Sequence, residues 1–142
     1  PNPSAEGESR AMSNALKKAN LTIDEIDYIN AHGTATPTND VVETEAIKQV
    51  FGKHAYELAI SSTKSMHGHA LGASSALELV ATTLAMHHGM IPPTANFTVA
   101  DDTCDLDYVP NIARKQTIDA AISNSFAFGG LNAVIALRRY QV

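Results

Sequence analysis

The sequence predicts an α/β fold in which helices are layered on a mixed, mostly parallel sheet that ends in an antiparallel hairpin. Three observations predict it. Helical patterns alternate with short apolar runs between residues 8 and 88. Two strand-like runs, 120–128 and 133–139, flank Gly129 and Gly130 near the end of the chain. With 142 residues, 44% of them hydrophobic, the chain has enough sequence for one domain with one core.

Three helices are expected between residues 8 and 88. The first covers residues 8–19 as an amphipathic surface helix, with its apolar face formed by Met12, Ala15, Leu16 and Ala19. The second begins near Asn39 and ends at Gly52, with Val42, Ala46, Ile47, Val50 and Phe51 turned inward. The third covers residues 70–88 and is apolar or small on almost every side, so we expect it inside the protein.

Two short strands are expected to separate these helices. Residues 26–30 alternate apolar and polar side chains, and they follow a turn in which Thr22 and Glu25 have the spacing of a capping box. Residues 58–61 form a short apolar run that is typical of a buried strand. Parallel pairing of these strands with the first strand of the hairpin gives the mixed sheet.

Composition argues against several classes of function. The net charge is −5 with no basic cluster, so neither nucleic acid nor an anionic membrane is an expected partner. The only cysteine is Cys104, which excludes an internal disulfide and fits a reducing compartment, so we expect a cytoplasmic protein. Residues 1–10 lack the features of a secretory signal, and no apolar run approaches the ~20 residues of a membrane span. The abrupt start without methionine suggests a fragment of a longer protein.

Candidate chemistry lies in segments that follow the predicted strands, where α/β proteins bind ligands. These segments are residues 31–40, 62–72 and 124–132. A single histidine such as His32 is more often a structural residue than a catalyst. The second segment adds Lys64 and His69, and a cation with two neutral imidazoles can stabilise a developing oxyanion or enolate.

Three motifs in order make the sequence recognisable: His-Gly-Thr-x-Thr at 32–36, Lys-Ser-x-x-Gly-His at 64–69 and Asn-Ser-Phe-x-Phe-Gly-Gly at 124–130. Together they resemble the elongating, type II-like β-ketoacyl-(acyl-carrier-protein) synthases of the thiolase-like superfamily. The resemblance extends over essentially all of residues 1–142. It implies that this chain is the C-terminal domain of such a synthase, and that the nucleophilic cysteine belongs to an N-terminal half absent from the sequence.

The resemblance implies roles for individual residues. His32 and His69 are the two active-site histidines, whose ring N–H groups hold the thioester carbonyl while malonyl decarboxylates. Lys64 lies behind them, and with Glu78 on the following helix it tunes and orients the imidazoles. A carboxylate such as Glu78 within so apolar a helix also needs a partner on physical grounds.

Substrate contacts follow in the same way. Thr34 and Thr36 match hydroxyl groups that hold the phosphopantetheine arm, although a capped turn explains the same residues. Phe128 matches a phenylalanine that gates the acyl pocket, and Asn124 and Phe126 line its loop. As core residues, these aromatics would look the same in sequence.

The implied function is decarboxylative Claisen condensation of an acyl thioester with malonyl-acyl-carrier protein, giving a 3-oxoacyl product for fatty acid biosynthesis. It requires no metal or redox cofactor, because the 4'-phosphopantetheine arrives on the acyl carrier protein. The complete protein is expected to be a homodimer, and this chain alone to be inactive. Two alternatives remain: a non-catalytic partner subunit like the chain-length factors, and a ketosynthase of a polyketide pathway.

Two other sites were considered and set aside. Cys104 is the one thiol in the chain, but nearby aspartates oppose thiolate formation and the resemblance places it away from the nucleophile. His67 with His69, or His87 with His88, lacks the spaced third and fourth ligands that a zinc site needs. His67 is interpreted as a neighbour of the pocket.

Overall fold

A computed structural model describes residues 2–140 and shows a four-stranded sheet in the order β2-β1-β5-β6. Strand β1 (Tyr28–Asn30) is parallel to β2 (Ala59–Ser61) and to β5 (Ala120–Ala127), and β5 is antiparallel to β6 (Leu131–Arg138). A second, two-stranded sheet pairs β3 (Met90–Ile91) with β4 (Arg114–Lys115). The predicted mixed sheet with an antiparallel edge is confirmed.

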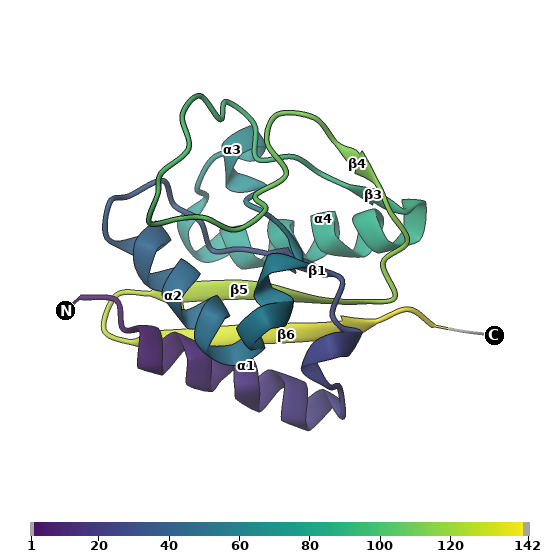
Figure 1. Cartoon of the computed structure of the whole chain (residues 1–142), viewed down its shortest axis with the longest axis horizontal. Helices are drawn as coiled ribbons and strands as arrows, with labels where there is room; N and C mark the ends of the chain where they lie inside the picture. The colour runs from purple at the N-terminus through teal and green to yellow at the C-terminus, as the bar shows by residue number, and fades with distance from the viewer. Residues whose placement is uncertain (1, 141–142) are drawn as a thin grey trace.

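Helices cover both faces of the sheet (Figure 1). Helix α1 (Ala5–Ala19) and α2 (Asn39–Phe51) lie on one face, and α4 (Ser74–His88) lies on the other. The single-turn α3 (Lys64–His67) and three 3-10 turns complete the order: η1 (Ile23–Glu25), η2 (Gly52–Tyr56) and η3 (Leu71–Ala73). None of the helices within residues 2–140 combines the length and apolarity that crossing a membrane requires.

Alternating strand residues supply two cores. Ile29, Ile60 and Ile122 point toward α1 and α2 and are fully buried. Their neighbours along each strand, Tyr28, Ala59 and Ala121, point toward α4. This alternation follows from the two-residue period of a strand, and it fixes the register of the whole sheet.

Local signals in the sequence agree with the boundaries of the first elements. Ser4 Oγ accepts a hydrogen bond from Gly7 N at 3.3 Å at the start of α1, and Asn20 ends the helix in the left-handed conformation with φ 53°. The capping box is present, with Thr22 N donating to Glu25 Oε2 at 2.7 Å.

The inward face of α2 differs from the prediction. Val42 and Val50 are only half-buried, whereas Glu43 is 3% exposed and Thr44 is 2% exposed. The pattern of apolar residues misplaces the buried face of α2, because a carboxylate is expected on the surface. Glu43 is buried because backbone amides receive it, as described below.

The third predicted helix is shorter and more exposed than expected. Residues 71–73 form a 3-10 turn instead, because Leu71 has a positive φ of 50° that an α-helix does not allow. Helix α4 packs on the sheet through Ala85 and Met86, but the exposed fractions of Leu77, Val80 and Leu84 are 45%, 58% and 51%. The prediction of a helix enclosed on all sides is therefore wrong for this chain taken alone.

Candidate active site

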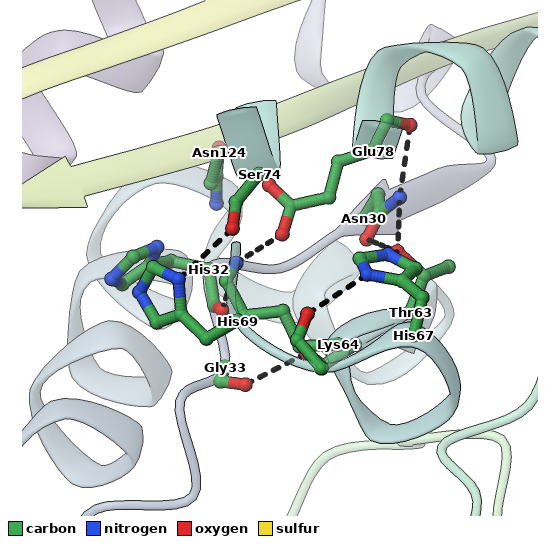
Figure 2. A network of polar contacts seen from close by, with 12 residues as sticks. Asn30, His32, Gly33, Thr63, Lys64, His67, His69, Ser74, Glu78 and Asn124 are labelled. Atoms are coloured by element: carbon green, nitrogen blue, oxygen red, sulfur yellow. Dashed lines mark hydrogen bonds and ion pairs between the residues drawn. The ribbon is translucent and has the colours of Figure 1, made fainter. Parts of the chain in front are cut away.

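The candidate site forms where β1 and β2 end side by side. Ala31 N, just after β1, donates to the carbonyl oxygen of Ser61 at 2.9 Å, so the two chains leave the sheet together. The segment after β1 contains His32, and the segment after β2 contains Lys64 and His69. The rings of His32 and His69 meet edge to face, with centroids 5.7 Å apart and planes at 88° (Figure 2). The convergence of the two imidazoles is as the sequence predicts.

Glu43 of α2 fixes the backbone at His32. Its carboxylate accepts hydrogen bonds from His32 N and Gly33 N, each at 2.8 Å, one on either oxygen. Gly33 is needed at this point, because its φ is +40° and a Cβ there would lie 2.6 Å from Cβ of Ser62. These hydrogen bonds and the close approach of Ser62 restrict the peptide that precedes the Thr-x-Thr turn.

Lys64 joins the two histidine segments to α4. Its side chain is buried, its Nζ donates to the carbonyl oxygen of His32 at 2.6 Å, and it forms an ion pair with Glu78 (Figure 2). Asn30, at the end of β1, anchors the same stretch of α4 because its Nδ2 lies 3.2 Å from the carbonyl oxygen of Glu78. A buried ion pair of this kind orients its neighbours strongly, because separating the charges would leave each without a partner.

Hydrogen bonding decides which nitrogen of His69 carries the proton. Nδ1 of His69 accepts from the backbone N–H of Leu71 at 3.1 Å and lies 2.9 Å from Oγ of Ser74. Since a backbone N–H can only donate, Nδ1 is the acceptor and the neutral ring carries its proton on Nε2. His69 therefore presents an Nε2–H donor.

His32 is held in its neutral form at physiological pH. Burial lowers its pKa to about 4, with smaller contributions from the positive charge of Lys64 and from His69. A neutral imidazole retains one N–H donor and adds no net charge to the site. His32 can thus offer a hydrogen bond to a carbonyl oxygen without bringing a positive charge into the site.

A cavity of about 540 Å³ opens beside Lys64 and His69. Thr34 and Thr36 line it, with their hydroxyl oxygens 3.1 Å apart. Thr36 Oγ1 also accepts from Asn39 N at 3.3 Å, so the capped turn considered from the sequence is present as well. Both features occur together, because the hydroxyls face the cavity from the turn that begins α2.

The three residues of the hairpin segment occupy different environments. Phe126 is 7% exposed and its ring centroid lies 5.9 Å from that of His32. Asn124 is fully buried, and its Nδ2 donates to Glu43 Oε1 at 3.1 Å. Phe128 is 93% exposed. The structure brings Phe126 to His32, joins Asn124 to Glu43 and leaves Phe128 on the surface.

Cys104 contributes to the lining of the cavity at the candidate site. It is half-buried and lines the same cavity as Lys64 and His69. The segment that carries it folds back over α2, where the hydroxyls of Tyr108 and Thr44 lie 2.5 Å apart. Within residues 2–140, no group of three or more His, Cys, Asp or Glu residues is arranged to hold a metal ion.

Comparison with known proteins identifies the family. Residues 1–98 match the family model described as the C-terminal domain of β-ketoacyl synthases. The chain belongs to the β-ketoacyl synthase family. It is 54% identical over 137 residues to nodulation protein E of Rhizobium leguminosarum bv. trifolii, and 52% identical over 141 residues to 3-oxoacyl-(acyl-carrier-protein) synthase 2 of a Synechocystis species. These alignments cover 96% and 99% of this chain.

The fold of this β-ketoacyl synthase chain also matches solved ketosynthases. One is a type II polyketide ketosynthase in complex with its acyl-carrier protein, with a TM-score of 0.95 and 39% identity, covering 99% of this chain and 35% of that one. The chain spans 34% of the length of each of the two relatives named above. It therefore represents about a third of such proteins.

Sequence analysis missed two buried carboxylates of this β-ketoacyl synthase chain. Glu43 and Glu8 are 3% and 1% exposed, yet neither was selected as a candidate. For Glu43 the signal was available, because it lies four residues before Ile47 on the face that also includes Ala46. For Glu8 the signal was its spacing of four and eight residues from the buried Met12 and Leu16.

We expect the loss of one member of the Lys64–Glu78 pair to destabilise the fold far more than the loss of both members. Lys64→Met should lower the free energy of unfolding by about 3–5 kcal/mol, because it leaves the Glu78 carboxylate buried without a cation. Adding Glu78→Leu should restore most of the loss. Denaturant unfolding of the full-length protein measures both effects. The control is Lys48→Met at the more exposed Lys48–Asp105 pair, which should cost under about 1 kcal/mol; equal costs for the two lysines would contradict the expectation.

The low pKa of His32 predicts a pH dependence of stability. The folded-state value of about 4 lies below the ordinary value of 6.5, so the unfolded chain binds more protons as the pH falls. The contribution of His32 should be complete above pH 6.5 and should fall by about 3 kcal/mol as the pH drops to 4. His32→Gln should remove this slope in unfolding experiments, whereas substitution of the exposed His88 by Gln should leave it unchanged. An unaltered slope in His32→Gln would show that His32 titrates normally.

Proposed function

We propose that this chain supplies the two histidine donors of a 3-oxoacyl-(acyl-carrier-protein) synthase. The observation that carries the proposal is the close approach of His32 and His69. Their ring centroids are 5.7 Å apart, and the neutral ring of His69 has its proton on Nε2. Two N–H donors that converge on one point favour an oxygen on which negative charge develops. The donor thioester of malonyl-acyl-carrier protein has such an oxygen when carbon dioxide leaves.

The reaction needs charge stabilisation more than proton transfer at this oxygen. The C–C bond between the carboxylate and the methylene carbon of the malonyl group breaks. Carbon dioxide leaves, and the electron pair of the bond stays on the remaining thioester as an enolate. The ring N–H groups hold the enolate oxygen, and the carbanion carbon attacks the acyl thioester on a cysteine, which departs as thiolate. Because His32 is already neutral, its donor is ready before the substrate arrives. The ion pair of Lys64 keeps the histidine segments in place.

The cavity beside His69 suits a neutral, extended ligand. Thr34 and Thr36 provide hydroxyl groups along its wall, which fits the amide groups of a 4'-phosphopantetheine arm carried by an acyl carrier protein. The similar ketosynthase solved with its acyl-carrier protein supports such a partner. Phe126, packed near His32, is the residue we assign to the acyl side of the site, and Phe128 to a gate that closes against it in the complete enzyme.

The nucleophile is proposed to come from an N-terminal half that packs on α4. Leu77, Val80 and Leu84 form an exposed apolar stripe on α4, and Leu131 and Ile135 of β6 are 73% and 43% exposed. The described residues leave this side of the molecule uncovered, and Figure 1 shows β6 at the edge of the sheet. Apolar surface of this extent favours a protein partner, and the complete enzyme is proposed to be a cytoplasmic homodimer.

The relatives carry names from more than one biosynthetic pathway. They include a nodulation protein, a 3-oxoacyl synthase and a polyketide ketosynthase. Fatty acid biosynthesis is the proposal that we favour. A non-catalytic subunit has no need of two aimed histidines and a buried lysine, so their presence argues for the catalytic alternative. A cysteine at the nucleophile position of the full-length protein would decide between the two.

His69→Ala in the full-length protein tests the proposed role. Decarboxylation of malonyl-acyl-carrier protein should fall by about 10²–10³-fold, because one of two oxyanion donors is lost. Transfer of an acyl group to the cysteine should change only a few-fold. Assays of radiolabelled carbon dioxide release and of acyl-enzyme formation separate the half-reactions. His67→Ala, an exposed neighbour on the same loop, is the matched control. Equal loss of both half-reactions in His69→Ala would contradict the assignment.

The proposed division of the protein can be tested with the chain itself. The 142-residue chain alone should release no carbon dioxide from malonyl-acyl-carrier protein, and co-expression with the remaining N-terminal portion should restore activity. Leu77→Asp with Val80→Asp should prevent this complementation, because the charges would be buried at the contact. Activity of the chain alone would overturn the proposal.

A further inference from the structure

Glu8 occupies an unusual place for a carboxylate. It lies on the buried face of α1 with Met12 and Leu16, and its exposed fraction is 1%. The other glutamate of the helix, Glu6, has a side chain that is 88% exposed and lies 3.7 Å from Arg10. An isolated carboxylate is costly to bury, so the surroundings of Glu8 must either neutralise its charge or supply donors.

The elements packed against α1 supply no cation at this point. The charged group of α2 that raises the pKa of Glu8 is Glu43, a second carboxyl group. From β5 comes Asn124, whose Nδ2 lies 3.6 Å from Sδ of Met12 and donates to Glu43. From β6, the neutral Asn132 lies beside Gly7, and the cation Arg138 is engaged at 2.8 Å by Glu25. Glu8 is thus surrounded by neutral groups and one anion.

Hydrogen-bond acceptors outnumber donors in this cluster of Glu8, Glu43 and Asn124. Within the described part of the chain, Oε2 of Glu8 and Oδ1 of Asn124 are buried and receive no hydrogen bond. Glu43 already takes the two amide protons of His32 and Gly33 together with one from Asn124. One additional proton on a carboxyl group would add the missing donor and remove the excess negative charge.

We propose that Glu8 is a positioning residue for the histidine loop, held as a neutral carboxylic acid so that Glu43 alone is ionised and keeps its grip on the His32–Gly33 amides. The inference rests on the proposed function for its catalytic meaning, since His32 is the residue that Glu43 positions. Its structural content, which carboxyl group holds the proton, is independent of that function.

The pKa values agree with this distribution of the proton. Burial, and then the charge of Glu43, raise the pKa of Glu8 to about 8. Burial also raises the pKa of Glu43, but the amides of Gly33 and His32 and the side chain of Asn124 oppose the rise. Glu43 has donors that favour its ionised form and Glu8 has none, so the shared proton resides on Glu8. Above about pH 8 both groups ionise and repel.

The test compares Glu8→Gln with Glu6→Gln in the full-length protein. Glutamine keeps the shape and the neutral charge at all pH values, so Glu8→Gln should retain decarboxylation at pH 7 within a few-fold. The wild type should lose activity as the pH rises through about 8, and Glu8→Gln should extend activity to higher pH. Glu6→Gln should follow the wild type. A wild-type alkaline limb that persists unchanged in Glu8→Gln would overturn the inference.

Two further measurements do not depend on catalysis. Infrared spectra at pH 7 should contain a protonated carboxylic acid band that Glu8→Gln removes and Glu6→Gln retains. The melting temperature of the wild type should fall relative to Glu8→Gln as the pH rises from about 4.5 to 8 and then stay level. In this range the folded state retains a proton that the unfolded state has released, so a higher pH favours unfolding. A missing band would sink the inference with the proposed function intact. A titrating band in a protein that releases no carbon dioxide would uphold the placement of the proton and refute the function.

Discussion

The buried ammonium group of Lys64 is the point on which the arrangement of the site depends. It donates to the carbonyl oxygen of His32 and pairs with Glu78, so it links the chain leaving β1, the turn after β2 and helix α4. Asn30 Nδ2, at the end of β1, adds a neutral link between the same segments, because it donates to Thr63 Oγ1 and to the carbonyl oxygen of Glu78, each at 3.2 Å. Because a separated pair would leave two charges without solvent, the geometry around Lys64 has few alternatives of similar energy. The edge-to-face contact of His32 and His69 follows from this constraint.

The three buried carboxyl groups solve the same physical problem in different ways. Glu78 has a cation, and Glu43 has two backbone N–H groups and an amide side chain. Glu8 has neither, and a bound proton satisfies it. These solutions are linked through His32: Lys64 holds its carbonyl oxygen, Glu43 holds its amide, and the charge of Glu43 raises the pKa of Glu8. The orientation of one imidazole thus depends on charge balance on both faces of the sheet.

Sequence reasoning succeeded where local rules dominate. The parallel strands place residues 32 and 64–69 at one edge of the sheet, so three short motifs were enough to predict that His32, Lys64 and His69 converge. It failed where a polar group is buried by tertiary contacts, as with Glu43, whose donors come from the segment after β1 and from Asn124 on β5. It also failed for α4, because an apolar helix predicts that two faces will be covered but does not say by which residues. The environment of Phe128 likewise depends on contacts that its own segment does not contain.

The exposed stripe of α4 and the histidine pair are adjacent in the structure. The stripe of Leu77, Val80 and Leu84 extends from the turn that carries His69, since Ser74 at the start of α4 lies 2.9 Å from the Nδ1 atom of that ring. In the proposed complete enzyme, a segment packed on the stripe would lie next to this turn, whereas the contacts of His32 with Glu43, Lys64 and Phe126 are made within this chain. A nucleophile brought in by the proposed N-terminal half would meet donors whose orienting hydrogen bonds are already made within this chain. Preorganisation of this kind is what electrostatic catalysis requires, because donors that had to reorient during the reaction would lose their advantage over water.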